Sequence, residues 1–141
     1  MNEIINIKTI NDGDSGSLSF FEANLTIPFE IKRIYYTYNT PIGVKRGMHA
    51  HKKLKQLLWC PFGEIEITID DGFKKTVYLL DTPDKGLLIT IGFWREFYSK
   101  KENSVLIVAA SDYYDENDYI RSYNEFIEYV RKGYWENENR V

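Results

Sequence analysis

The sequence predicts an all-β fold, an antiparallel sandwich or barrel, followed by one C-terminal helix. Short runs of β-branched and aromatic residues recur between turn signals such as Asp70-Asp71-Gly72 and Pro83-Asp84-Lys85-Gly86. This spacing is typical of antiparallel β-proteins. After Asp118 the apolar residues switch to helical spacing. A chain of 141 residues with 43% apolar and 28% charged residues is expected to form one domain, residues 1–141.

The first predicted strand, residues 31–38, lies between Pro28 and Pro41 and follows a loop expected at residues 11–17. Strand alternation places Arg33, Tyr35 and Thr37 on one face, so these side chains should line a cavity together or face out together. Further strands are predicted at residues 56–60, 64–70, 74–80, 86–91 and 104–110. In 64–70, isoleucines alternate with polar residues, which indicates one buried face and one solvated face.

The helix is predicted after Asp118, where apolar residues recur with helical period and Gly133 can end the helix. It should pack on the outside of the sheets. The apolar positions that predict it are Tyr119, Tyr123, Phe126, Ile127 and Val130.

Composition excludes several classes of partner. A net charge of -3 gives no reason to expect nucleic acid or a membrane surface as a partner. No apolar run approaches the roughly 18 residues that span a bilayer. The first residues lack a basic segment and an apolar segment of a secretory signal, so a cytoplasmic location is expected.

The chain has only two histidines, and they lie two residues apart in Arg46-Gly47-Met48-His49-Ala50-His51. In an extended strand these side chains project to the same face. Two imidazoles in one space indicate metal binding or proton transfer, whereas two histidines hydrogen-bonded within a strand would be purely structural.

Gly43 to Gly63 reads G-x5-H-x-H-x4-Q-x6-G and resembles the first motif of the cupin superfamily, G-x5-H-x-H-x3,4-E-x6-G. The resemblance implies a small cupin jelly roll, an antiparallel β-sandwich. Gln56 stands where cupins have a metal-binding glutamate, and Arg95 stands where the second cupin motif has a histidine. Two histidines and an amide beside a guanidinium are a poor donor set for a divalent cation. We therefore expect no metal and no other cofactor, and the histidine pair becomes a candidate acid and base.

A second resemblance covers residues 15–130. The segments Arg46-Gly47-Met48-His49-Ala50-His51-Lys52 and Ser111-Asp112-Tyr113-Tyr114-Asp115-Glu116, with Asp118-Tyr119-Ile120-Arg121, are similar to the nucleotide-sugar 3,4-ketoisomerase family. The resemblance implies conversion of TDP-4-keto-6-deoxy-D-glucose to a TDP-3-keto-6-deoxyhexose by proton transfer through an enediol. It also implies a place in the synthesis of 3-amino-3,6-dideoxy sugars for bacterial glycans such as lipopolysaccharide, and a homodimer.

The same resemblance implies roles for single residues. His49 and His51 are the proton-transfer pair; His51 is assigned the C3 proton and His49 the relay or the delivery to C4, and the reverse order stays open. Tyr35, Arg46 or Arg95 would stabilise the oxyanion.

Substrate binding is assigned to a further set, in which arginines hold the diphosphate. Variation at the positions of Ser15 and Arg95 goes with the configuration of the product at C4 in this family; Arg95 favours the gluco product, and Ser15 fits neither pattern. The predicted substrate-binding residues are Arg33, Arg46, Arg95, Gln56 and Ser15, with Arg121 as a weaker candidate.

Three other functions are compatible with the residues. One is a cupin sugar-nucleotide epimerase, which also removes protons next to a 4-keto group. The others are a metal cupin such as a dioxygenase, and a non-catalytic sugar-binding cupin.

Overall fold

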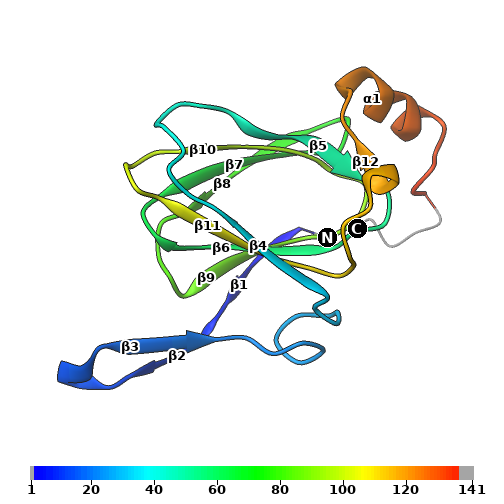
Figure 1. The fold of residues 1–141 in the computed structure, drawn as a ribbon. Coiled ribbons are helices and arrows are strands. Elements are labelled where there is room, and N and C mark those ends of the chain that lie inside the picture. The colour runs from blue at the N-terminus through cyan, green and yellow to red at the C-terminus, as the bar shows by residue number, and fades with distance from the viewer. Residues whose placement is uncertain (1, 137–141) are drawn as a thin grey trace.

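Two five-stranded antiparallel sheets face each other in the computed structural model, which describes residues 2–136 (Figure 1). One sheet has the strand order β1-β9-β6-β11-β4 and the other has the order β12-β5-β10-β7-β8. A separate hairpin, β2-β3, lies between β1 and β4 in the chain.

The strands are β1 (Glu3–Asn6), β2 (Lys8–Asn11), β3 (Ser17–Phe20), β4 (Arg33–Thr37), β5 (Arg46–His51), β6 (Gln56–Phe62), β7 (Ile65–Asp70), β8 (Lys75–Leu80), β9 (Lys85–Ile89), β10 (Trp94–Ser99), β11 (Val105–Ala110) and β12 (Tyr119–Ile120). The helices are the 3-10 turns η1 (Gly13–Ser15) and η2 (Glu116–Asp118) and the α-helix α1 (Tyr123–Arg131). None of these helices is both long enough and apolar enough to cross a membrane.

The all-β prediction with a C-terminal helix is confirmed. Each predicted strand is present, with bounds that differ by one or two residues at most ends. In β7 the isoleucines Ile65, Ile67 and Ile69 are buried in the main core between the sheets, as their alternation predicts. The structure adds β1, β2, β3, β10 and β12, whose residues show no clear alternation.

The helix begins later than predicted. Tyr119 belongs to β12, where it pairs with His51, and Ser122 caps α1 by accepting a hydrogen bond from the Glu125 backbone N–H. Tyr119 was therefore wrongly placed in the helix: a tyrosine can continue a helical pattern by chance, whereas strand pairing depends on a distant partner. Gly133 follows the helix with a φ of 68°, in the left-handed region that suits a helix stop.

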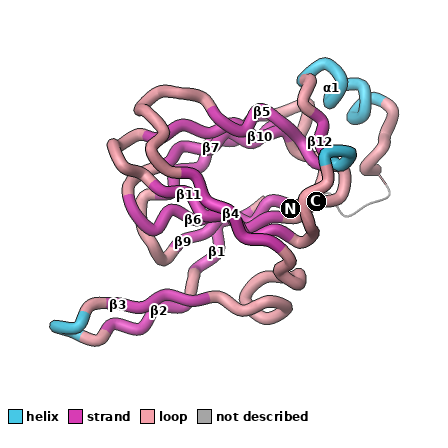
Figure 2. The backbone as a smooth tube through the Cα atoms, viewed as in Figure 1, coloured by secondary structure: helices cyan, strands magenta, loops and turns pink. Residues whose placement is uncertain are grey.

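The helix lies at one end of the sandwich, close to β12 and β5 (Figure 2). Phe126 and Val130 pack with Trp94 and Trp135, and the Trp135 indole donates a hydrogen bond to the Lys52 carbonyl at 3.0 Å. This packing fixes the segment before the helix, residues 116–122, against the strand that carries both histidines.

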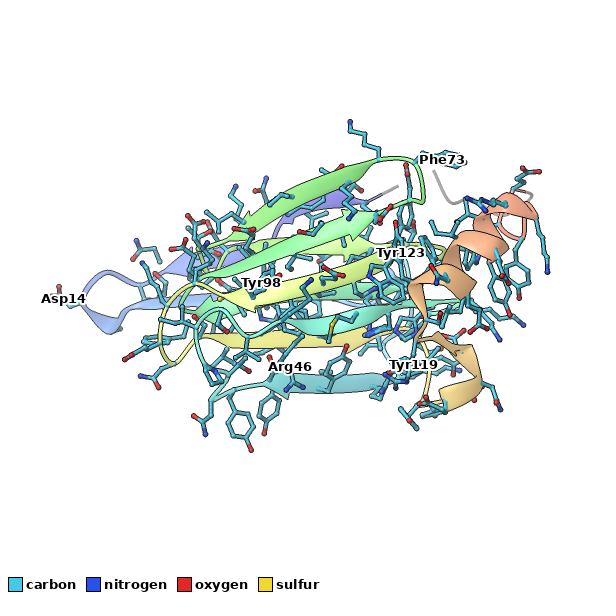
Figure 3. All side chains as sticks on the ribbon, turned by 90° about the horizontal axis from the view of Figure 1, so that it is seen from above. Asp14, Arg46, Phe73, Tyr98, Tyr119 and Tyr123 are labelled. Atoms are coloured by element: carbon cyan, nitrogen blue, oxygen red, sulfur yellow. The ribbon has the colours of Figure 1, made fainter. Side chains whose placement is uncertain are left out.

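The β2-β3 hairpin projects away from the two sheets (Figure 1). Residues 11–17, predicted to be a loop, form its end and include η1. Figure 3 shows Asp14, at this end, and Tyr119 at opposite ends of the molecule.

Candidate active site

A cavity of about 250 Å³ opens between β4, β5 and the segment after β11. It contains one histidine, three arginines and three tyrosines. The lining residues are Arg33, Tyr35, Thr37, Arg46, Gly47, His49, Phe97, Tyr114, Tyr119 and Arg121.

One face of β4 forms a wall of this cavity. Arg33, Tyr35 and Thr37 all line it, as strand alternation requires for residues two apart. The Arg33 guanidinium lies over the Tyr35 and Tyr114 rings, 5.2 and 5.6 Å from their centroids. Arg33 Nε is buried and has no hydrogen-bond partner within residues 2–136, so this arginine keeps an unused donor at the cavity wall.

The three arginines give the cavity a positive lining in a chain of net charge -3. Arg46 is exposed at the start of β5. Arg121 lies 4.2 Å from the centroid of Tyr119 and donates two hydrogen bonds to the Glu116 carboxylate, from Nε at 2.6 Å and Nη2 at 2.9 Å. Such a lining suits an anionic ligand.

A bulge in β5 orients His49. Gly47 and Met48 both have positive φ values, 86° and 49°, and the pairing of β5 with β10 shifts its register at this point. The Gly47 carbonyl accepts a hydrogen bond from His49 Nδ1 at 2.8 Å. Because a carbonyl can only accept, Nδ1 carries the hydrogen and Nε2 is the unprotonated nitrogen of the neutral ring.

Asp118 orients His51 in the same way. His51 Nδ1 donates to Asp118 Oδ2 at 2.9 Å, and Asp118 Oδ1 accepts from the Lys53 backbone N–H at 2.8 Å. Burial raises the pKa of Asp118, but the hydrogen bonds from His51 and Lys53 outweigh it, so the pKa lies below its usual value and Asp118 is ionised. His51 therefore also presents an unprotonated Nε2, and Asp118 would stabilise the imidazolium formed when that atom takes a proton.

Both imidazoles are neutral at physiological pH. Burial, followed by the charge of Arg95, lowers the pKa of His49 to about 3. Burial also lowers the pKa of His51 to about 4, although Asp118 acts in the opposite direction. The rings meet edge to face with centroids 4.8 Å apart, and neither Nε2 atom has a hydrogen-bond partner within the described residues. His49 thus lines the cavity, whereas His51 is fully buried and adjoins it through its contact with the His49 ring.

Sequence reasoning missed Asp118, Tyr114 and Tyr119 as site residues. Tyr119 contacts both imidazoles, with centroids 5.0 Å from His49 and 4.4 Å from His51. The signal was the segment Ser111–Arg121, which carried the family resemblance but gave no role for these three residues.

Three predicted substrate-binding residues do not line the cavity. Gln56 and Arg95 are buried behind Tyr35: Gln56 Nε2 donates to the Tyr35 hydroxyl at 3.0 Å, and Arg95 Nη1 donates to Gln56 Oε1. Ser15 is exposed and lies in η1 next to Asp14, which Figure 3 shows at the end of the projecting hairpin, far from Tyr119. Within one chain, Ser15 does not reach the cavity.

The residues present do not fit the metal that cupins commonly hold. The Gln56 oxygen, which would replace the cupin carboxylate, is occupied by the Arg95 guanidinium. That cation is 2% exposed and lies close enough to lower the pKa of both histidines. A divalent ion between the imidazoles would be repelled by Arg95 and would lack an anionic ligand.

Comparison with known proteins agrees with this geometry. The model of the FdtA family, described as WxcM-like, C-terminal, matches residues 1–131. The TDP-4-oxo-6-deoxy-alpha-D-glucose-3,4-oxoisomerase of Aneurinibacillus thermoaerophilus is 45% identical over 131 residues, which are 93% of this chain and 94% of that protein.

Solved structures of similar sequence share the fold. A 3,4-ketoisomerase from Helicobacter canadensis is 44% identical with a TM-score of 0.89, and the match covers 92% of this chain and 97% of that one. A histidine-to-asparagine variant of the Thermoanaerobacterium thermosaccharolyticum 3,4-ketoisomerase, in complex with TDP-4-keto-6-deoxyglucose, is 39% identical with a TM-score of 0.89 over 93% and 94% of the chains. The chain therefore belongs to the FdtA family of nucleotide-sugar 3,4-ketoisomerases.

Proposed function

We propose that this protein converts TDP-4-keto-6-deoxy-D-glucose to TDP-3-keto-6-deoxyglucose. The observation that carries the proposal is the pair of adjacent neutral imidazoles, His49 and His51, whose buried Nε2 atoms have no hydrogen-bond partner within residues 2–136, with His49 in the wall of an arginine-lined cavity. Of the relatives named above, the Aneurinibacillus enzyme is named for this TDP-linked sugar and the Thermoanaerobacterium variant is in complex with it.

The reaction needs only proton movements. A ketone at C4 acidifies the hydrogen on C3, so His51 Nε2 takes that proton and the C–H electrons form a C3=C4 double bond. The electrons of the C4 carbonyl move to its oxygen, which gives an enediolate. His51 Nε2 gives up its proton and His49 Nε2 takes one up, either directly from His51 or by exchange with water, and His49 delivers that proton to C4. The O3 hydroxyl proton passes to O4, and the carbonyl is left at C3. Substrate and product are isomers, so atoms and electrons balance.

Asp118 supports the assignment of His51 as the base. Its carboxylate bonds His51 Nδ1, so the positive charge that forms on His51 has an ionised partner 2.9 Å away. The Nδ1 partner of His49 is an uncharged carbonyl. His51 therefore gains more stabilisation on protonation than His49 does.

At about 250 Å³ the cavity is smaller than most ligand pockets, which measure about 300 to 1,000 Å³. It therefore suits a single sugar ring rather than a whole nucleotide sugar. In this proposal the hexose enters the cavity and the diphosphate lies across its mouth, near the exposed Arg46 and the partly buried Arg33, which both line the cavity. The assignment of the gluco configuration depends on Arg95. This residue does not line the cavity and would act on the substrate through the side chains that it contacts. A 3-keto product is the form that a transaminase needs to make a 3-amino sugar.

We also propose a homodimer in the cytoplasm. The β2-β3 hairpin places the apolar side chains of Ile10 and Leu18 opposite each other, 51% and 54% exposed, on an arm that projects from the sheets. A two-stranded hairpin alone is marginally stable in water, so a second copy that covers this arm would stabilise it. Such an assembly is also what would bring Ser15 to a cavity.

The test is incubation with TDP-4-keto-6-deoxyglucose in heavy water, followed by NMR. A 3-keto product with deuterium at C4 is expected. Deuterium at C5 would indicate an epimerase, and binding without exchange would indicate a sugar-binding module; either result contradicts the proposal.

The same experiment separates the histidines. With His51→Asn, neither C3 exchange nor product is expected, whereas TDP should bind almost as tightly as to the wild type. With His49→Asn, the C3 hydrogen should still exchange with solvent while product formation falls. Exchange patterns that are reversed between the two variants would assign the base to His49.

A further inference from the structure

Gln56 and Arg95 form a buried chain of hydrogen bonds that ends on a hydroxyl at the cavity wall. Arg95 is 2% exposed and Gln56 is fully buried. Arg95 Nη1 donates to Gln56 Oε1, Arg95 Nη2 donates to the Phe93 carbonyl at 3.0 Å, and Gln56 Nε2 donates to the Tyr35 hydroxyl at 3.0 Å. Only Tyr35, of these side chains, lines the cavity.

The order of donors and acceptors in these hydrogen bonds follows from Arg95, the first residue of the series. A guanidinium has donors and no acceptor, so the side of the Gln56 amide that faces Arg95 must be the oxygen. The amide NH₂ therefore faces Tyr35, whose oxygen must accept. The hydrogen of the Tyr35 hydroxyl then remains free to point into the cavity, where it can only donate.

Arg95 adds a positive field to this geometry. Within residues 2–136 the guanidinium has no ion-pair partner closer than 4 Å, although burying an unpaired charge is costly. Each hydrogen bond in a chain polarises the next, so a cation at one end strengthens the donor at the other. The pKa of Tyr35 is raised by burial, against the lowering effect of Arg95, so the hydroxyl keeps its proton at neutral pH.

We propose that Gln56 and Arg95 are positioning residues that hold the Tyr35 hydroxyl as a hydrogen-bond donor to the C4 oxygen of the substrate. Negative charge develops on that oxygen when the C3 proton leaves, and a donor that is already aligned stabilises it without reorganisation. Tyr35 is then a catalytic residue that binds the oxyanion and keeps its own proton. The inference rests on the proposed isomerase function and adds a role for two residues that do not reach the substrate.

Gln56→Glu tests the direction of the chain. The carboxylate keeps the size of the side chain and its pairing with Arg95, but it offers Tyr35 only acceptors. The Tyr35 hydroxyl would turn to donate to it, away from the cavity. We expect kcat to fall about 100-fold, the typical effect of losing one oxyanion donor, with KM changed less than about twofold.

Tyr35→Phe should cause the same loss in kcat, and the double variant Tyr35→Phe/Gln56→Glu should lose no more than Tyr35→Phe alone. Tyr36→Phe is the matched control, because Tyr36 is the next residue of β4 and is exposed on the opposite face; its kcat should equal that of the wild type. Additive losses, about 10⁴-fold in the double variant, would show that Gln56 acts independently of Tyr35 and would overturn the proposal.

Two controls keep the result interpretable. Gln56→Met, whose side chain can neither bond Arg95 nor donate to Tyr35, should lower kcat in the wild type but should cause no further loss in the Tyr35→Phe variant. Measurement of TDP binding by calorimetry shows that each variant is folded. Gln56→Glu recreates the cupin donor set with His49 and His51, so kcat is measured with a chelator; recovery of activity on chelation would overturn the proposal. Absence of turnover in the wild type would instead refute the isomerase function itself.

Discussion

At the scale of single residues, the site depends on which nitrogen of each imidazole carries the hydrogen. Gly47 and Asp118 settle this by accepting from the two Nδ1 atoms at 2.8 and 2.9 Å. A base must have its free nitrogen on the substrate side, so these partners matter as much as the rings they hold.

Asp118→Asn should lower kcat by about 100-fold or more, which is the typical contribution of a general base to the rate. An asparagine can present its NH₂ group to His51 Nδ1 and so force the hydrogen onto Nε2, which removes the base while leaving the ring in place. Steady-state kinetics would show the loss, with TDP affinity nearly unchanged. Asp112→Asn, in the same segment but exposed and bonded to its neighbour Tyr113, is the matched control. Equal activity of Asp118→Asn and wild type would exclude the role of Asp118.

The lowered histidine pKa values predict an unusual acid limb. The unprotonated rings are the active form, so kcat/KM should stay level as the pH falls through 6.5 and decline towards pH 4, near the pKa values of about 3 and about 4. A pH profile measured at constant ionic strength checks this. A midpoint near 6.5 would contradict it.

The same shifts predict how stability depends on pH. In the unfolded chain both histidines take up protons near pH 6.5, while the folded rings stay neutral until about pH 4 and 3. The unfolded state binds more protons between these values, so the free energy of unfolding should be highest above pH 6.5 and fall as the pH drops below it. Urea denaturation at several pH values measures this. The variant His49→Asn/His51→Asn should show a flatter dependence in that window.

At the scale of elements, two glycines bound the histidine motif, and both have positive φ values, 79° at Gly43 and 96° at Gly63. The space around them differs. A Cβ at Gly43 would meet no atom within 4 Å, whereas a Cβ at Gly63 would lie 2.2 Å from Ser104 Oγ and 2.6 Å from Ser104 Cα. Ser104 also accepts from the Glu64 N–H and donates to the Lys101 carbonyl, so it ties the β6-β7 turn to the start of β11.

Gly63→Ala should therefore lower the free energy of unfolding by about 2 to 4 kcal/mol, because it adds a backbone clash to the cost of a left-handed residue. Gly43→Ala carries only the conformational cost, about 1 to 2 kcal/mol. Urea denaturation of both variants under the same conditions provides the comparison. Equal losses would show that the clash with Ser104 is relieved by local movement.

At the scale of the whole molecule, the projecting hairpin carries exposed apolar side chains that the rest of residues 2–136 does not cover. If a second copy covers it, Ile10→Glu/Leu18→Glu should convert the protein from dimer to monomer in sedimentation velocity, since four charges would enter the interface. Phe73→Glu, at an 85% exposed turn away from the hairpin, is the control and should leave the dimer intact. A wild type that sediments as a monomer at micromolar concentration would refute the homodimer.

Local sequence patterns predicted part of the fold and one wall of the site, but not the elements whose positions depend on distant residues. The alternation in β4 correctly grouped Arg33, Tyr35 and Thr37, and the isoleucines of β7 were correctly assigned to the core. By contrast, β10 mixes Arg95 and Glu96 with aromatic residues, so no clear alternation marks it in the sequence, and it pairs with β5 across the bulge at Gly47 and Met48. Ser15 was grouped with the site by resemblance alone. That residues 1–141 form one domain, and that no metal is required, stay predictions; residues 1 and 137–141 lie outside the described part of the chain.

The sequence by itself determined that His49 and His51 share one face of a strand, because side-chain direction in a strand depends only on the local period of two. Only the tertiary structure decided what those rings meet. Asp118 is 67 residues from His51, and Gln56 lies between Arg95, 39 residues away, and Tyr35, 21 residues away. Contacts at such separations arise from the pairing of strands and the packing of the C-terminal segment, which no local period specifies. From the sequence the histidine pair was compatible with either metal binding or proton transfer. In the structure, the protonation of the two rings and the charges around them favour proton transfer.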